Sequence, residues 1–409
     1  MNYTLIKDKT PNNDLARTVN KKIQNDIDYI CSKVNDLLGN QLYCILLCGG
    51  FGRGEGSVTV KNNSVHIVND YDFTVVLNAK NKFHYLWLYK KIQGPLEKLA
   101  QKLAQELGIK QVDLSPKPLS YFKQTTLKIE NYEVKKGHVL VYGKKNPTRY
   151  MPNWKPEDIP LFEGTWLFRN RGAGLLLAAL YFMTTQKVKE SDKENFIIEC
   201  TKAQLAMGDA VLLLKKRYHH LYNKRLIRTR TLDMVDIPFG EEIKNRYQQS
   251  LVQKLHPDFE NYIKIDLVDW WYDATNLFLK FFMHYEQKRL SHSFDSWIDY
   301  TTLTKPEDRL DIKMLAGRLL KSTGSKISLK SIQSSIKKSN PSYGISLVAL
   351  VLFSAINHKF NIPTMNKAAH LLNMKLTGHP KSDWILLARA ALNEIHPGGE
   401  AGRVLAEYA

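Results

Sequence analysis

Two aspartates separated by a single residue, Asp70 and Asp72, stand at the head of the apolar run Phe73 to Leu77. Side chains alternate between the two faces of a β-strand, so both carboxylates are expected to point to one face and Tyr71 to the other. Carboxylates that converge in this way suit hard divalent cations, which prefer oxygen ligands. The pair therefore predicts a metal site, although it also fits a solvated acidic turn ahead of a strand.

A glycine-rich stretch precedes the aspartates. Residues 46–58 read LLCGGFGRGEGSV, with five glycines in eight positions. Glycine lets backbone amides approach a ligand closely and adopt positive φ, so such a loop can cradle phosphates. Neither standard phosphate-loop pattern fits, because the lysine of one is missing and the third glycine of the other is replaced by Ser57. The loop alone is a weak indication of nucleotide binding.

A third carboxylate, Asp113, follows in the segment Ile109 to Leu119, a predicted strand that is cut by two prolines. A charge within a strand is costly unless it serves a purpose. Two metal ions about 3.5–4 Å apart can stabilise both the attacking and the leaving oxygen of a phosphoryl transfer. Asp113 is therefore a candidate third carboxylate, beside Asp70 and Asp72, in a metal site of this kind.

This combination of motifs resembles the DNA polymerase beta-like nucleotidyltransferase superfamily. Its members have a strand, a Gly-Gly or Gly-Ser turn, an Asp-x-Asp that opens the next strand, and a further Asp on a later strand. Here these features are YCILLC, Gly49-Gly50, Asp70-Tyr71-Asp72 and Asp113. The form GGFGRGEGS followed by NDYDF is similar to a bacterial branch of generic nucleotidyltransferase-domain proteins. The matched motifs cover residues 44–115.

The resemblance implies a two-metal-ion nucleotidyltransferase that moves a nucleoside monophosphate from an NTP to an acceptor hydroxyl. It implies two Mg²⁺ or Mn²⁺ ions held by Asp70, Asp72 and Asp113, one on the triphosphate and one that lowers the pKa of the acceptor hydroxyl. Pyrophosphate would leave. The backbone amides of Gly49 and Gly50 would contact the β- and γ-phosphates.

Three further residues are expected to bind the nucleotide by the same resemblance. Arg53 could contact phosphate, and it fits equally well an ion pair with Glu55 that shapes the loop. Ser57 is expected to supply a hydroxyl, because Phe51 stands where many family members have Ser. Lys202 is the helical lysine expected near the triphosphate, although it also fits an ordinary lysine on a helix surface.

Two other functions fit parts of the pattern. A glycosyltransferase also uses an Asp-x-Asp motif with a nucleotide sugar, but its apolar strand precedes the aspartates, whereas here the stronger apolar run follows them. The second function is a non-catalytic, nucleotide-binding scaffold. The presence of all three carboxylates argues against it, because the transfer chemistry needs each of them.

The acceptor is not determined by these motifs. The formal net charge of +19 favours a polyanionic partner such as RNA, DNA or an anionic membrane face. The run from Lys215 to Arg230 holds seven lysines and arginines and no carboxylate. An RNA 3′ end is the acceptor that we expect first. The alternatives are a protein, as in AMPylating regulators and toxin–antitoxin components, and a small molecule or glycan.

The elements that must position these residues can be predicted from hydrophobic spacing. Residues 12–40 and 84–108 read as helices, and YCILLC and DFTVVL read as buried strands. The segments SVTV and SVHIV predict a hairpin around KNN, and KIENYEVKKGHVLVYG predicts a second hairpin. Residues 1–155 thus predict an α+β catalytic domain with a small mixed sheet flanked by helices.

The rest of the chain reads as mainly α-helical. We expect a helical domain at 156–300 that completes the nucleotide cleft, and a basic helical region at 301–409. No apolar run reaches the ~20 residues that span a bilayer, no secretory signal is visible, and the four cysteines form no CxxC pair. A cytoplasmic protein without a transmembrane segment is therefore expected. The predicted helices lie at 172–186, 194–223, 239–262, 266–290 and 344–357.

Overall fold

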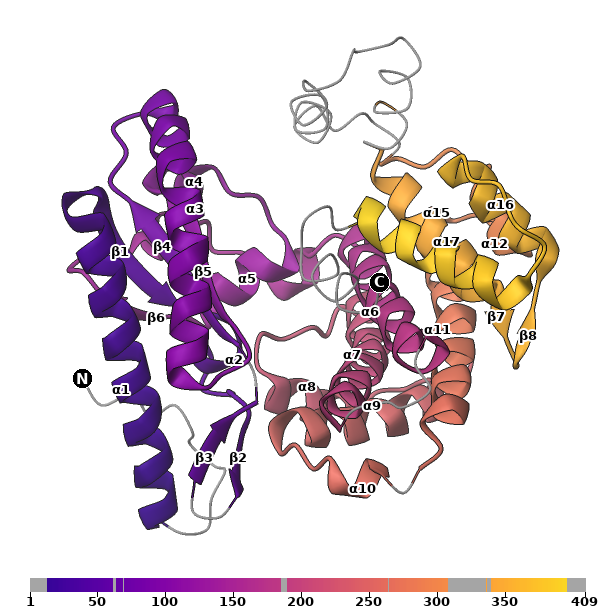
Figure 1. Ribbon diagram of the computed structural model, residues 1–409, viewed down its shortest axis with the longest axis horizontal. Helices are drawn as coiled ribbons and strands as arrows, with labels where there is room; N and C mark the ends of the chain where they lie inside the picture. Colours follow the sequence, from indigo (N-terminus) through magenta and orange to yellow (C-terminus); the bar gives the residue numbers. More distant parts are fainter. Residues whose placement is uncertain are drawn as a thin grey trace. The chain divides into compact units, whose positions relative to one another are not determined.

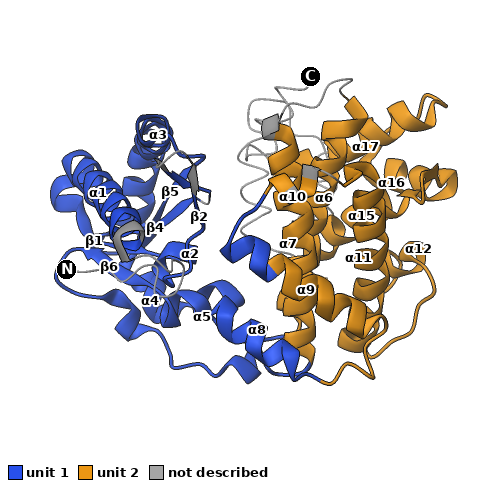
Figure 2. Cartoon of the chain, turned by 90° about the horizontal axis from the view of Figure 1, so that it is seen from below, with its two compact units in different colours: residues 1–160, 215–232, 251–258 blue, residues 161–214, 233–250, 259–409 orange. Residues whose placement is uncertain are grey.

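The computed structural model divides into two compact units (Figure 2). Unit 1 comprises residues 1–160, 215–232 and 251–258, and unit 2 comprises residues 161–214, 233–250 and 259–409. The first segment of unit 1 ends close to the boundary expected near 155. Two later segments, 215–232 and 251–258, also belong to unit 1. The predicted domains were consecutive stretches of the chain and did not include this return. The residues described are 13–61, 64–68, 70–184, 190–263, 265–307, 336 and 340–395.

Unit 1 is built on a four-stranded mixed sheet with the strand order β5-β4-β1-β6. β1 pairs antiparallel with β4 and with β6, whereas β4 and β5 are parallel. β2 and β3 form the predicted antiparallel hairpin, whose KNN turn lies partly outside the described residues. The strands are β1 (Leu42–Leu47), β2 (Val58–Lys61), β3 (Ser64–Ile67), β4 (Tyr71–Leu77), β5 (Val112–Pro118) and β6 (Val139–Tyr142).

Helices cover both faces of this sheet (Figure 1). Helices α1 and α3 bury their apolar stripes against the face that carries Tyr71, Phe73 and Val75. On the opposite face, Val76 packs in one cluster with Phe122 of α4 and with Met151, which lies in the segment after β6. The helices of unit 1 are α1 (Asn13–Leu38), α2 (Gly49–Gly52), α3 (Lys82–Leu107), α4 (Leu119–Gln124), α5 (Ile129–Lys136) and α8 (Tyr222–Arg230), with short 3₁₀ turns at Gly39–Gln41, Pro147–Tyr150 and Pro156–Asp158.

The second predicted hairpin is wrong in its first half. The segment IENYEVKK forms α5, and only Val139–Tyr142 forms a strand, β6. Glu130 lies in the first turn of α5 and two lysines lie in its last turn, a charge order that stabilises the helix dipole. Gly137 then ends the helix.

The two prolines of β5 are tolerated because this strand lies at the edge of the sheet.

Unit 2 is mainly α-helical, so the fold class of the whole chain is α+β, as predicted. The helix expected at 194–223 ends earlier, at Leu214, because the backbone reverses at Lys216 with a φ of 55°. The remaining helices are α6 (Phe162–Thr184), α7 (Glu190–Leu214), α9 (Gly240–Leu255), α10 (Glu260–Ile263), α11 (Leu267–Leu290), α12 (Trp297–Tyr300), α15 (Pro341–Phe353), α16 (Ile362–Leu372) and α17 (Pro380–Ile395), with a small hairpin of β7 (Ala355–Ile356) and β8 (Lys359–Phe360).

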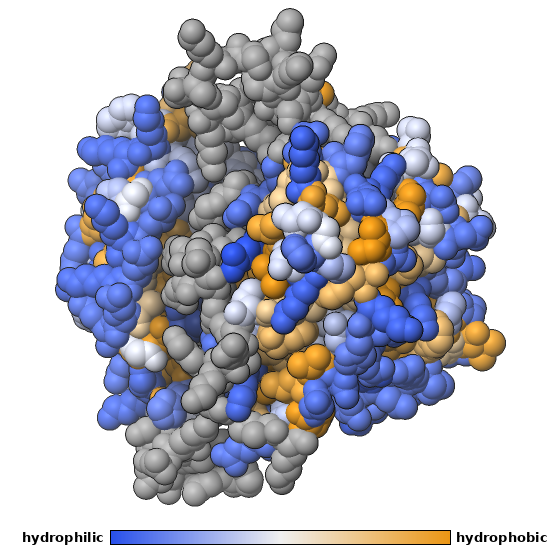
Figure 3. All heavy atoms as spheres, turned by 45° about the vertical axis from the view of Figure 1, so that its right-hand side comes forward, coloured by the Kyte–Doolittle hydropathy of each residue, from blue (hydrophilic) through white to orange (hydrophobic). Residues whose placement is uncertain are grey.

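The surface of unit 2 that faces the viewer in Figure 3 carries mostly polar residues, with smaller apolar areas between them. Across the described ranges, every helix is too short or too polar to traverse a bilayer. Much of the predicted basic region at 301–409 lies outside the described residues, which omit 308–335, 337–339 and 396–409.

Candidate functional site

Asp72 of β4 and Asp113 of β5 are direct neighbours across two parallel strands. Residues paired in register on adjacent strands present their side chains to the same face of the sheet. The residues on either side of each aspartate are buried in the core beneath α1 and α3. Both carboxylates therefore belong to the opposite face, at the end of the sheet where β4 and β5 begin.

Asp70 comes directly before β4, two residues ahead of Asp72, and its side chain is half-buried. Its negative charge acts on both Asp72 and Asp113 and raises the pKa of each. The three carboxylates expected from the sequence are thus close enough to interact electrostatically.

The glycine turn lies directly against Asp72. The N–H of Cys48 donates to the carbonyl oxygen of Asp72 over 2.7 Å, which joins the end of β1 to the start of β4. Gly49 follows with a φ of +58°, and a Cβ at this position would lie 1.8 Å from Oδ2 of Asp72. Only a residue without a side chain lets the carboxylate approach the backbone this closely. Gly49 and Gly50 form the first turn of α2, where helix N–H groups lack helical partners.

The surroundings of Asp72 disfavour the charged form of its carboxylate. Burial is the largest cause that raises its pKa, the charges of Asp70 and Asp113 add to it, and the pKa reaches about 7. Lys254 and Arg53 act in the opposite direction. An aspartate that holds its proton near neutral pH is characteristic of functional sites, where burial and like charges are combined.

Asp113 shows the same pattern at a more exposed position. Removal from water is the largest cause that raises its pKa, and the charge of Asp70 is the next, while Lys117 opposes them. Negative charge therefore accumulates on the face of the sheet that carries the three aspartates. A bound cation would relieve this repulsion.

The three carboxylates are suitable ligands for Mg²⁺ or Mn²⁺, which prefer oxygen donors. No set of three Asp, Glu, His or Cys side chains in the described part of the chain is already arranged around one point. Binding of an ion would thus require the carboxylates to rotate toward each other. The donor chemistry and the excess of negative charge fit such an ion.

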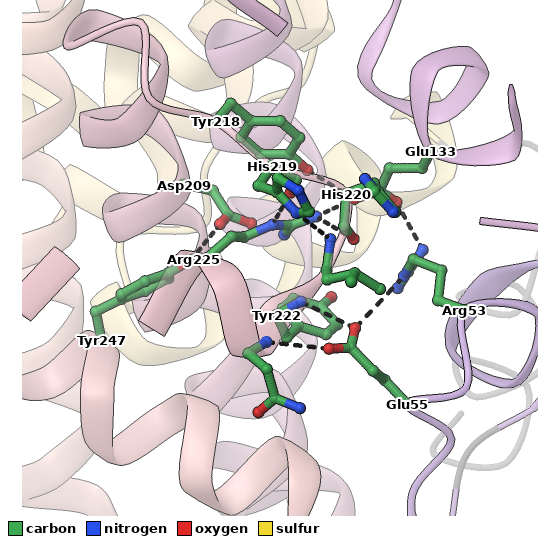
Figure 4. Close-up of polar contacts among 12 residues, drawn as sticks. Arg53, Glu55, Glu133, Asp209, Tyr218, His219, His220, Tyr222, Arg225 and Tyr247 are labelled. Atoms are coloured by element: carbon green, nitrogen blue, oxygen red, sulfur yellow. Dashed lines mark hydrogen bonds and ion pairs between the residues drawn. The ribbon is translucent and has the colours of Figure 1, made fainter. Parts of the chain in front are cut away.

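Arg53 is buried in an ion-pair cluster (Figure 4). Its Nη1 donates to Oε2 of Glu133 over 2.8 Å, and Arg225 donates to the other carboxylate oxygen. The hydroxyl of Tyr218 donates to that same oxygen over 2.7 Å. The Arg53 guanidinium is thus directed toward Glu133, and its expected contact with phosphate stays a prediction.

Glu55, the other charged residue of the loop, accepts hydrogen bonds from the backbone N–H groups of Tyr222 and Asn223 at 2.9 and 3.0 Å (Figure 4). These groups lie at the start of α8, where a carboxylate also complements the helix dipole. Its distance to Nε of Arg53 is 3.9 Å. The ion-pair alternative for Arg53 and Glu55 is therefore present, and together they attach residues 215–232 to the glycine loop.

The other two expected nucleotide contacts also have partners. Ser57 is fully buried, and its Oγ donates to the backbone carbonyl of Lys254 rather than facing solvent. Lys202 lies on α7 of unit 2, where its Nζ is 2.8 Å from Oε1 of Glu199. Both side chains are thus engaged within their own unit, Ser57 by the backbone of Lys254 and Lys202 by Glu199.

Lys254 is a residue that the sequence analysis missed. It lies near the end of α9, in the segment 251–258 that returns to unit 1, and its charge lowers the pKa of Asp72. The sequence around it predicts only a helix. Its position near the aspartates depends on tertiary structure, because the hydroxyl of the buried Ser57 donates to the backbone carbonyl of Lys254.

The basic run at 215–230 is partly structural. Arg225 is buried against Glu133, and Arg228 donates to the carbonyls of Arg217 and Tyr218. Four cations of the run remain exposed, and these are Lys216, Arg217, Lys224 and Arg230. The run therefore supplies both an anchor for the loop and a smaller basic surface.

Glu133→Gln is expected to lower the free energy of unfolding by about 1.5–3 kcal/mol at pH 7, the value of a hydrogen bond to a charged group. Burial alone would raise the pKa of Glu133, but Arg53 and Arg225 outweigh it and hold the pKa below its ordinary value. The stabilisation is thus present at neutral pH and is lost as the pH falls through this lowered pKa. Urea unfolding at several pH values measures the difference.

Glu97→Gln on the exposed face of α3 is the matched control and should leave the stability at pH 7 unchanged. Equal stability of Glu133→Gln and the parent protein would contradict the anchoring role of the cluster.

A hollow of about 460 Å³ lies in unit 2, lined among others by Lys280, Trp297 and Phe360, and contains none of the three aspartates. Comparisons of the chain with protein-family models, with curated proteins and with solved structures found no match. The functional assignment therefore rests on the geometry of Asp70, Asp72 and Asp113 around the glycine turn.

Proposed function

We propose that unit 1 catalyses the metal-dependent transfer of a nucleoside monophosphate from an NTP to an acceptor hydroxyl. The observation that carries this proposal is the Asp72 carboxylate resting on Gly49, with Asp113 beside it in register. A glycine turn and carboxylates suited to a metal ion are thereby adjacent. The partial burial of Asp72 strengthens the interaction of its carboxylate with charged ligands.

In the proposed reaction, bound Mg²⁺ or Mn²⁺ would neutralise the triphosphate and stabilise the attacking and leaving oxygens. Asp70 and Asp72 would hold two such ions, and Asp113 would share the second, which lowers the pKa of the acceptor hydroxyl. The N–H groups of Gly49 and Gly50 would donate to the phosphate oxygens. The acceptor hydroxyl would lose its proton to water as its oxygen bonds to the α-phosphorus, and pyrophosphate would leave as the bond between the α- and β-phosphates breaks.

Lys254 is the cation that we assign to the triphosphate in place of Lys202. Its charge already acts on Asp72. Lys254→Met is expected to raise the KM for NTP by about tenfold or more, the effect of removing a hydrogen bond to a charged group. Lys202→Met is the control and should leave KM unchanged. Measuring both variants with saturating acceptor distinguishes them, and a larger effect of Lys202→Met would reverse the assignment.

We propose an RNA 3′ end as the acceptor, because the net charge is +19 and four cations of the 215–230 run are exposed. Incubation with each α-labelled NTP, Mg²⁺ and either total RNA or lysate tests this. Label on RNA supports the proposal. Label on protein or on a small product would show that the acceptor is not RNA. The absence of label under every condition would favour a non-catalytic scaffold.

We also propose a cytoplasmic location. The cysteines Cys31, Cys44, Cys48 and Cys200 are free and buried. Burial raises the pKa of the Cys31, Cys44 and Cys48 thiols to about 12, so these thiols are protonated and unreactive at neutral pH. Free, protonated thiols fit a reducing compartment.

A further inference from the structure

Three large apolar side chains are exposed on the first turns of α3. The exposed fractions are 83% for Phe83, 52% for Leu86 and 59% for Trp87. Residues at i, i+3 and i+4 lie on one side of a helix. They therefore form one continuous apolar surface, which we call the α3 patch. Contiguous apolar surface of this kind marks interaction sites more often than scattered single residues do.

The α3 patch is carried by a well-anchored helix start. The side chain of Asn81 caps the helix by accepting from the N–H of His84 over 2.9 Å. On the inward side, the hydroxyl of Tyr85 donates to the carbonyl of Pro116 over 3.2 Å, and Leu88 is buried. The core is therefore complete without the patch, and the exposed side chains are available to a partner.

Positive charge surrounds the α3 patch. Lys80, Lys82, Lys90 and Lys91 are all exposed, and residues 80–96 contain no carboxylate. Lys90 and Lys91 follow Trp87 by one helical turn, so they extend the same side of α3. An apolar surface bordered by lysines is complementary to a partner that has an apolar layer beneath anionic groups.

The environment of Trp87 separates two partners of this kind. The His84 ring stacks with the Trp87 ring at a centroid distance of 6.0 Å, and Nζ of Lys91 lies 5.4 Å from its centroid. These contacts come from the helical turns before and after Trp87 and lie against part of its π system. A nucleic-acid base would need an open ring face, and Leu86 offers no stacking surface. Insertion into an apolar layer needs only the exposed edge.

We propose that the α3 patch docks unit 1 onto an anionic lipid surface. Phe83, Leu86 and Trp87 would enter the boundary between headgroups and acyl chains, where aromatic side chains are favoured. The four lysines would lie among the anionic headgroups. β4 begins beside Asp72, and α3 begins just after β4 ends, beyond a short connection. The patch thus lies beyond the far end of the strand from the aspartates, and lipid would leave them accessible.

The test is sedimentation of the full-length protein with phosphatidylcholine vesicles, with and without phosphatidylserine. We expect binding only when phosphatidylserine is present. Phe83→Ser with Trp87→Ser, and separately Lys90→Gln with Lys91→Gln, should each weaken it by roughly tenfold or more. Val235→Ser, which removes a side chain that is 93% exposed, is the control and should bind as the parent protein does.

Unchanged thermal unfolding of the variants would exclude misfolding as the reason for lost binding, because all substituted side chains are exposed. Equal binding to vesicles with and without phosphatidylserine would overturn the role of the lysines. Full binding by Phe83→Ser with Trp87→Ser would overturn the proposal, as would failure of the parent protein to bind any vesicle. If instead these variants lost affinity for single-stranded RNA, the α3 patch would be a nucleic-acid surface.

Discussion

Asp72→Asn is expected to reduce nucleotidyl transfer by more than about 100-fold and, at the same time, to stabilise the protein. Asparagine keeps the size of the side chain but removes the charge that would hold a metal ion. Loss of an outer-shell partner of a metal ligand already reduces activity by about 10–100-fold, so loss of a proposed ligand should exceed this. The measurement is the rate of label transfer from NTP at saturating Mg²⁺.

The gain in stability follows from the raised pKa of Asp72, which lies near 7. The folded protein holds this proton more tightly than the unfolded chain does. Stability therefore decreases as the pH rises from about the ordinary value of 3.8 through 7. The neutral amide of the Asp72→Asn variant would not carry this penalty, so the advantage of the variant is largest at pH 8 and shrinks as the pH falls from 7 toward 4. We expect a rise in Tm of a few degrees at pH 8, since about 1 kcal/mol shifts Tm by about 2–4 °C.

Mg²⁺ provides the complementary measurement. Ligands that bind only the folded state raise Tm, so Mg²⁺ should stabilise the parent protein and not Asp72→Asn. Asp36→Asn on α1, whose side chain is exposed, is the matched control and should change neither activity nor the response to Mg²⁺. Full activity of Asp72→Asn would show that the reaction centre lies elsewhere.

The elements around the site could largely be predicted from residue spacing. Helices α1 and α3 have apolar stripes that fill one face of the sheet. β4 alternates buried and less buried residues from Tyr71 to Thr74 and is buried on both faces after that, as the apolar run behind the Asp-x-Asp motif predicts. The prediction was wrong at α5, where Val and Tyr suggested a strand. The order of charges in this segment favours a helix more strongly than the β-propensity of those residues favours a strand.

The contacts within the site could be predicted only in part. The spacing of Asp70 and Asp72 places them on one face, but the position of Asp113 depends on α3 returning the chain so that β5 runs parallel to β4. Local sequence does not specify this register. Local sequence also does not reveal that the Arg53 guanidinium pairs with Glu133, or that residues 251–258 bring Lys254 close enough to act on Asp72.

Gly49→Ala is expected to impair catalysis far more than its effect on stability would suggest. The backbone at this position has a φ of +58°, and alanine in this region costs about 1–2 kcal/mol. The added Cβ would also lie 1.8 Å from Oδ2 of Asp72, so the carboxylate must move. A displacement of about 1 Å in a catalytic group can reduce the rate by roughly 100-fold.

Gly108→Ala separates the two effects. Gly108 ends α3 with a φ of +63°, but a Cβ there would meet no atom within 4 Å. Both alanine variants should therefore lose about 1–2 kcal/mol in urea unfolding, while only Gly49→Ala should lose nucleotidyl transfer. Equal activity of the two variants would contradict the importance of the contact between Gly49 and Asp72.

The Asp72→Asn background shows whether the loss in Gly49→Ala acts through this carboxylate. If the steric effect is transmitted through Asp72, then adding Gly49→Ala to Asp72→Asn should reduce the remaining activity no further, because substitutions that act on one contact are not additive. If the glycine acts instead through its own N–H on the phosphates, the double variant should be less active than Asp72→Asn alone. The glycine turn would then contribute to transfer independently of the carboxylate that rests on it.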